Sequence, residues 1–92
     1  MTARIFPQSI EAERALLGGL ILDPDQIEDV TGLVGADDFA RPDHAALFEL
    51  IRGMRARGEK VDSITVPERV VRGGHDERFG GLGYVLGLPD AA

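Results

Sequence analysis

The 92-residue chain has no cysteine, no tryptophan and only one lysine. The lack of cysteine excludes disulfide bonds, thiol catalysis and zinc sites with cysteine ligands. No run of about 18 apolar residues is present to span a membrane. The first seven residues, Met1 to Pro7, lack the apolar core of a signal peptide. We therefore expect a single small cytoplasmic domain with no membrane partner.

The single lysine, Lys60, does not belong to a phosphate-binding P-loop. That loop requires Gly-x-x-x-x-Gly-Lys-Ser/Thr, and Lys60 is followed by Val61. The glycines near the C-terminus also resemble a dinucleotide-binding loop only superficially, because no strand precedes them. A turn between helices accounts for Gly80, Gly81 and Gly83. We expect no cofactor in this chain.

Positive charge is scarce, and the net charge is −6. Residues 1–50 contain ten acids and three bases, whereas residues 51–92 contain six acids and seven bases. An acidic chain is repelled by phosphates, so we expect no strong direct binding to nucleic acid. A basic or amphipathic partner would suit this chain better. Alternatively, the acidity only keeps the domain soluble.

Helical periodicity dominates the chain, and no segment alternates as a strand would. We predict an all-α domain of about five short helices. Residues 1–8 should form an extended lead-in, because Pro7 keeps Phe6 out of helical geometry. Residues 9–88 should form the helical domain, with Ser9 as the first N-cap, and residues 89–92 a tail.

Two glycines interrupt the first predicted helix, whose apolar side carries Leu16, Leu17, Leu20 and Ile21. Gly18 and Gly19 should each cost about 1 kcal/mol relative to alanine. Close approach of another backbone would explain both residues.

Asp23 can cap the second predicted helix, with Pro24 at the first helical position and Gln26 completing a capping box. Leu22 and Ile27 have the spacing of a hydrophobic staple, and Gly35 should end the helix. The predicted buried stripe consists of Ile27, Val30, Leu33 and Val34.

The third predicted helix is the longest and runs from Pro42 to Gly58. Its inward face should carry Leu47, Phe48, Leu50, Ile51 and Met54. After a turn at Gly73 and Gly74, a last short helix is predicted from about Gly80 to Leu88, where Pro89 should stop it.

The fourth helix has two candidate starts. Asp62 could cap it, with Val61 and Val66 as a staple, but Pro67 would then remove a helical hydrogen bond. Thr65 as the cap places Pro67 in the first turn and forms a capping box with Glu68. We favour Thr65 and predict a helix over residues 66–72.

One basic cluster lies at the C-terminal end of the third predicted helix and just beyond it. It could contact a partner or phosphate, although cations at a helix C-terminus are stabilising without any ligand. Both interpretations stay open. The candidate partner-binding residues are Arg52, Arg55, Arg57 and Lys60.

The other polar groupings have simpler explanations. His44 and His75 are far apart in sequence and have no cysteine to join, so we expect no metal site. Paired carboxylates at Asp37 and Asp38 can perform acid–base chemistry, but nothing nearby suggests a nucleophile. We expect a turn that anchors Phe39, and no catalytic residue.

A series of segments, in order from about Phe6 to Leu88, resembles the N-terminal domain of DnaB-type replicative DNA helicases. The segments are Pro7-Gln8-Ser9-Ile10-Glu11-Ala12-Glu13, Leu16-Leu17-Gly18-Gly19, Ala36-Asp37-Asp38-Phe39, Pro42-Asp43-His44, Arg57-Gly58, Val61-Asp62-Ser63-Ile64-Thr65 and Gly80-Gly81-Leu82-Gly83-Tyr84.

The resemblance implies a compact orthogonal helical bundle that forms the N-terminal collar of a hexameric ring. In that family the collar helps to assemble the ring and recruits primase and other replisome proteins. Its partners would be helicase subunits, primase or a helicase loader. ATP and magnesium would belong to the motor domain, and the collar itself does not hydrolyse ATP.

The chain departs from the family at Pro67, where the helix usually continues, and at Asp76, where an apolar residue is usual. It also ends where the family continues into a helical hairpin, a linker and the motor. Because that hairpin contributes much of the pairing, we expect the isolated chain to be a monomer or weak dimer. One alternative is a free-standing adaptor that binds a helicase, loader or primase in trans. Another is a small DNA-binding protein that uses the basic cluster.

Overall fold

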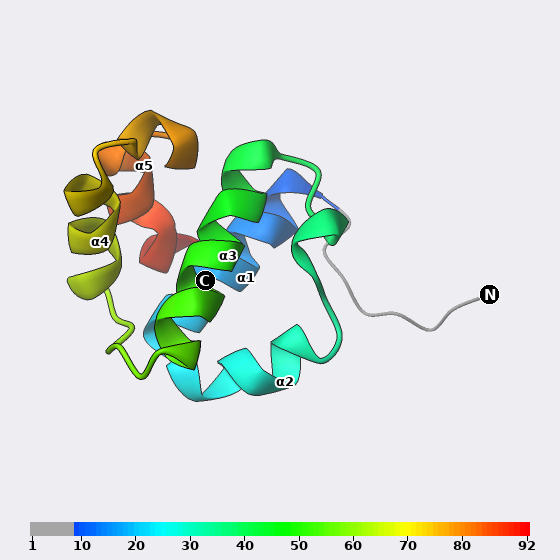
Figure 1. Cartoon of the computed structure of the whole chain (residues 1–92). Coiled ribbons are helices and arrows are strands. Elements are labelled where there is room, and N and C mark those ends of the chain that lie inside the picture. The colour runs from blue at the N-terminus through cyan, green and yellow to red at the C-terminus, as the bar shows by residue number, and fades with distance from the viewer. Residues whose placement is uncertain (1–8) are drawn as a thin grey trace.

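The computed structural model describes residues 9–92, so the lead-in expected at residues 1–8 lies outside the described residues. Within this range the chain is all-α, as predicted, and contains no strand. The elements are α1 (Ile10–Leu22), η1 (Pro24–Gln26), α2 (Ile27–Thr31), η2 (Ala36–Asp38), α3 (Pro42–Ala56), α4 (Thr65–Gly73), η3 (Asp76–Phe79), α5 (Leu82–Gly87) and η4 (Leu88–Ala91), where η marks a 3-10 helix (Figure 1).

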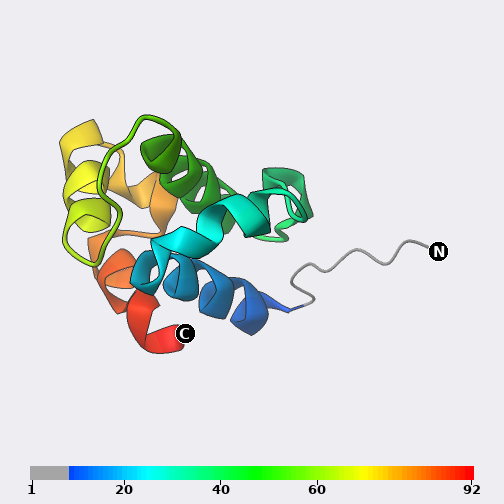
Figure 2. The same cartoon turned by 90° about the horizontal axis from the view of Figure 1, so that it is seen from below.

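The long helix α3 lies at the centre of the fold, with α1 packed behind it and α4 and α5 to one side (Figure 1). Figure 2 shows that η4, at the end of the chain, lies against α1. The core between these elements is apolar and contains Leu17, Leu20, Ile21, Ile27, Leu47, Phe48, Ile51, Met54, Val66, Val70, Val85 and Leu88.

Helix α1 begins as predicted, because the Ser9 hydroxyl accepts a hydrogen bond from the Ala12 N–H at 3.0 Å. Its two glycines differ in their surroundings. A Cβ on Gly18 would lie 2.1 Å from the backbone oxygen of Leu88, so glycine is what allows η4 to approach. A Cβ on Gly19 would meet nothing within 4 Å. Close backbone approach is therefore confirmed for Gly18 and, within the described residues, is wrong for Gly19.

The helical segment begins at Pro24 with Asp23 at the cap position, as predicted, but the expected capping box is wrong, because the Asp23 side chain makes no capping bond. The Asp23 backbone N–H donates to the Gly19 carbonyl, so the same residue also ends α1. Residues 24–26 then form a 3-10 turn before α2. Leu22 is 59% exposed while Ile27 is 2% exposed, so the two do not form a staple.

The predicted end of this helix is also wrong. Helix α2 stops at Thr31, and Gly35 instead begins η2, where its N–H donates to the Asp38 carboxylate at 2.8 Å. Because the helical turn ends early, Leu33 leaves the apolar stripe and is 51% exposed, while Val34 remains buried.

Helix α3 agrees with its prediction. It opens with Pro42 in the first turn, and Gly58 takes a positive φ of 77° just after its end. Four of the five predicted inward residues are buried, and Leu50 is half-buried against the core. The helix predicted near the C-terminus is α5. Beyond it the chain continues as η4, which contains Pro89 and most of the residues expected as a tail.

Helix α4 spans Thr65–Gly73, within one residue of the predicted 66–72 at each end, but its capping bonds follow the alternative that we did not favour. Asp62 Oδ1 accepts from the Thr65 N–H at 2.7 Å, and Thr65 Oγ1 accepts from the Asp62 N–H at 2.9 Å. This reciprocal pair is a capping box with Asp62 as the cap. Val61 and Val66 are both buried, as a staple requires. The two reciprocal bonds outweigh the one bond that Pro67 removes, so the prediction of Thr65 as the cap is wrong.

Replacing Asp62 with asparagine should keep this cap but remove its response to acid. Hydrogen bonds from the backbones of Thr65 and Ile64 lower the pKa of Asp62 below its ordinary 3.8. The charged Asp62 therefore stabilises the folded state above pH 3.8, and this stabilisation is lost as the pH falls through the lower pKa of the folded state. The free energy of unfolding in urea should be measured for both chains from neutral to acidic pH. The wild-type chain should be more stable than Asp62→Asn at neutral pH, and this difference should disappear in acid. A difference that stays constant throughout would contradict this explanation.

Candidate protein-interaction site

The candidate partner-binding residues lie at the C-terminal end of α3 and just beyond it. Arg52 pairs with Glu49 one turn earlier. Arg55 reaches back to the acidic η1–α2 segment, 2.9 Å from Glu28 and 3.2 Å from Asp25. The Arg55 guanidinium lowers the pKa of Glu28. These contacts tie α3 to the segment that follows α1.

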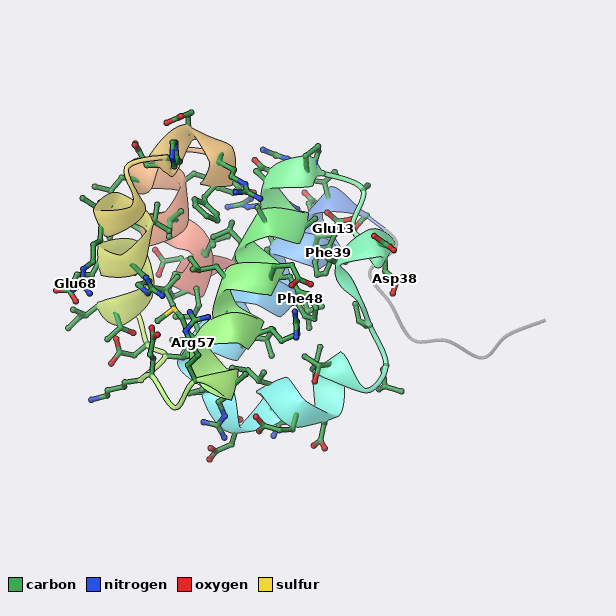
Figure 3. All side chains as sticks on the ribbon, in the orientation of Figure 1. Glu13, Asp38, Phe39, Phe48, Arg57 and Glu68 are labelled. Carbon is green, nitrogen blue, oxygen red and sulfur yellow. The ribbon has the colours of Figure 1, made fainter. Side chains whose placement is uncertain are left out.

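The other two cations are paired as well. Arg57, between α3 and α4 in Figure 3, lies 2.8 Å from Glu59, which also pairs with Arg69 of α4 at 3.1 Å. The two arginines lower the pKa of Glu59. Lys60 lies 3.7 Å from Asp62. The structure therefore places each of the four sequence-predicted residues beside a carboxylate rather than together in a free basic patch.

The other polar candidates from the sequence have structural roles. Asp38 anchors η2, and Phe39 is buried with its ring 5.0 Å from that of Phe48 (Figure 3). The expected turn that anchors Phe39 is confirmed. Among residues 9–92, no group of three or more His, Asp or Glu side chains lies close enough together to hold a metal ion. No helix in that part of the chain is long and apolar enough to cross a membrane.

A buried polar cluster that was not predicted from the sequence joins α1, α3 and α5. Glu13 is 1% exposed, and its carboxylate accepts from the Ala40 N–H at 2.5 Å. His44 is fully buried, with Nδ1 2.7 Å from Glu13 and Nε2 2.5 Å from the Tyr84 hydroxyl. We call Glu13, His44 and Tyr84 the buried triad.

The hydrogen bonds of the buried triad form a complete chain. A carboxylate only accepts, so His44 Nδ1 carries a hydrogen and donates a hydrogen bond to Glu13. In the tautomer whose only ring hydrogen is on Nδ1, Nε2 accepts a hydrogen bond from the Tyr84 O–H. Burial raises the pKa of Tyr84, which keeps this hydroxyl protonated as a donor. The guanidinium groups of Arg14 and Arg41 lie 5.5 and 5.2 Å from the centre of the Tyr84 ring.

The buried triad holds the helices together and does not form a substrate-binding site. His44 is inaccessible to solvent, and each of its ring nitrogens already has a partner. A sequence signal was present, because Glu13 shares a helix face with the core residues Leu17 and Leu20. His44 likewise shares a face with Phe48. Polar residues on apolar helix faces indicate buried hydrogen bonding.

Three of the large exposed apolar side chains lie together at α4 and α5. Ile64 is 72% exposed, Leu86 55% and Val71 53%. They line a shallow groove of about 490 Å³, completed by Pro67 and Leu82. We call these five residues the α4–α5 surface.

The rim of the α4–α5 surface is polar. Glu68 points outward from α4 in Figure 3, and it lies 4.0 Å from Arg72 one turn later. An apolar centre with a polar rim is typical of a protein-interaction site. Its residues are not conspicuous in sequence, since Val71 and Leu86 share their helices with similar core residues.

Comparison with known proteins gives one consistent result. The family model for the DnaB-like helicase N terminal domain matches residues 5–92. The chain is 39% identical over 88 residues to the replicative DNA helicase DnaB of Geobacillus stearothermophilus, covering 96% of this chain and 19% of that protein. It is 38% identical over 79 residues to DnaB of Mycobacterium leprae, covering 86% of this chain and 13% of that protein.

A solved structure is similar as well. The crystal structure of the N-terminal domain of DnaB helicase from Mycobacterium tuberculosis matches with a TM-score of 0.82 at 36% identity. The match covers 94% of this chain and 60% of that one. The chain thus spans less than a fifth of the two helicases' length and about three fifths of the solved domain.

Proposed function

Because the chain belongs to the family of DnaB-like helicase N-terminal domains, we propose that it is a non-catalytic interaction domain of a replicative helicase. In this role it helps helicase subunits to assemble and recruits primase or other replisome proteins in the bacterial cytoplasm. ATP hydrolysis and DNA unwinding would belong to a motor in another part of such a helicase. The absence of a P-loop motif from the sequence supports this division.

The observation that carries the proposal is the α4–α5 surface. Three apolar side chains there are each more than half exposed and adjacent. Leaving them in water is unfavourable, and burying them against a neighbouring helicase subunit would recover that free energy. DNA binding is the weaker alternative, because the four cations that could contact phosphate are paired with carboxylates.

The test is the binding of the fluorescently labelled chain to helicase subunits and to primase from the same organism, measured by anisotropy. We expect binding to helicase subunits, weakened at least about tenfold when Val71 and Leu86 are both replaced by glutamate. Leu33→Glu is the matched control, since Leu33 is similarly exposed but lies outside the α4–α5 surface. Absence of binding to either protein, or ATP turnover by the purified chain, would refute the proposal.

A further inference from the structure

A second apolar groove lies between α1 and the η1–α2 segment. Helix α2 lies apart from α4 and α5 (Figures 1 and 2). Its volume is about 470 Å³. Leu22, at its edge, is 59% exposed, so the groove presents apolar surface to solvent. We call it the α1–α2 groove, and it is lined by Ala15, Leu16, Gly19, Leu22, Gln26 and Val30.

Gly19 is the unusual residue in this groove. It lies inside α1, where glycine is unfavourable relative to alanine. Unlike Gly18, it has no neighbour within 4 Å of an added Cβ, and its φ is not positive. The described residues therefore give no internal reason for glycine here. Without a side chain at Gly19, and with only a methyl group at Ala15 one turn earlier, another backbone can approach α1 closely.

The chain segment that forms most of the groove is acidic. Residues 15–40 contain six acids and no lysine, arginine or histidine. Asp23 lines the groove, Asp29 adjoins Val30, and Glu11 lies one turn before Ala15 on α1.

These three carboxylates differ from their neighbours in being unpaired. Asp25 and Glu28 are held by Arg55. Within residues 9–92, by contrast, Glu11, Asp23 and Asp29 form no ion pair. The groove therefore combines apolar walls, accessible backbone and uncompensated negative charge.

We propose that the α1–α2 groove binds an amphipathic helix of another protein, with a stripe of small and medium apolar residues flanked by lysine and arginine. Its apolar stripe packs on Leu16, Leu22 and Val30, with its backbone close to Gly19. Its cations lie near Asp23 and Asp29, where they neutralise free carboxylates. The inference rests on the proposed function only in treating the chain as a domain that recruits partners. It assigns that role to a surface separate from the α4–α5 surface.

The probe is a synthetic peptide helix with leucine and alanine on one face and lysine along both sides. A second peptide carries glutamate at every lysine position. We expect saturable binding of the basic peptide, measured by fluorescence anisotropy, and at least tenfold weaker binding to Gly19→Leu, whose side chain fills the groove. Asp23→Asn combined with Asp29→Asn should weaken binding several-fold, as should a rise in salt from about 50 to about 300 mM.

Two controls separate this proposal from the preceding one. The double variant Val71→Glu/Leu86→Glu should bind the basic peptide like the wild-type chain. Circular dichroism should show that Gly19→Leu keeps its helix content, because the position is open. Equal affinity for the glutamate peptide, undiminished affinity of Gly19→Leu, or no saturable binding of the basic peptide would each overturn the inference, whatever the result with helicase subunits.

Discussion

Replacing Glu13 with alanine is expected to lower the free energy of unfolding by about 1–3 kcal/mol, the usual cost of leaving a buried hydrogen-bond donor without its acceptor. The substitution leaves His44 Nδ1 and the Ala40 N–H without their acceptor inside the protein. His44 has no access to water, because it is fully buried, whereas Ala40 is an exposed residue. The measurement is chemical denaturation followed by circular dichroism.

Glu11 provides the matched control. It is an exposed acid in the same first turn of α1, so Glu11→Ala should change the free energy of unfolding by no more than about 0.5 kcal/mol. Tyr84→Phe removes only one hydroxyl at the other end of the buried triad and should cost about 1 kcal/mol. If Glu13→Ala and Glu11→Ala were equally stable, the buried triad would not hold α1, α3 and α5 together.

The adjacent glycines of α1 should respond to alanine with opposite signs. Gly18→Ala places a methyl group 2.1 Å from the Leu88 carbonyl oxygen, a backbone atom that cannot rotate away. Overpacking costs about 1–3 kcal/mol, and a clash with backbone should lie at the upper end of this range. Gly19→Ala meets no neighbour and should instead raise the free energy of unfolding by up to about 1 kcal/mol, because alanine is the better helix former.

Hydrogen exchange can locate the effect of Gly18→Ala. We expect faster exchange in η4, which must move off α1 to make room for the methyl group. Gly19→Ala should leave η4 unchanged. If both variants shifted stability in the same direction, the close contact between α1 and η4 would be wrong.

Local sequence signals predicted the helices well where one residue dominates the geometry. Ser9, Pro42 and Gly58 lie at the expected ends of α1 and α3 because capping, proline and positive φ act within one turn. The predicted cap of α4 was wrong for a different reason. The sequence showed that Pro67 removes a helical hydrogen bond, but only the structure shows the two hydrogen bonds between Asp62 and Thr65 that offset this loss.

The interaction surfaces were harder to predict because they depend on distant contacts. The sequence left open whether the basic cluster contacts a partner, because Glu28, which pairs with Arg55, lies 27 positions earlier in the chain. In the buried triad, His44 bonds residues 31 and 40 positions away. Helical periodicity identified Val71 and Leu86 only as apolar, and not as exposed. The ordered family resemblance indicated the kind of function, which these local rules could not.

We infer that the chain acts through protein contacts rather than catalysis. Proton–nitrogen correlation spectra of the isotopically labelled chain test this inference most directly. Helicase subunits, primase, and ATP with magnesium would be added in separate titrations. We expect saturable shifts with helicase subunits, centred on Ile64, Val71 and Leu86, and no saturable shifts with ATP and magnesium. Saturable shifts with ATP and magnesium, or none with either protein, would contradict the assignment as a non-catalytic interaction domain.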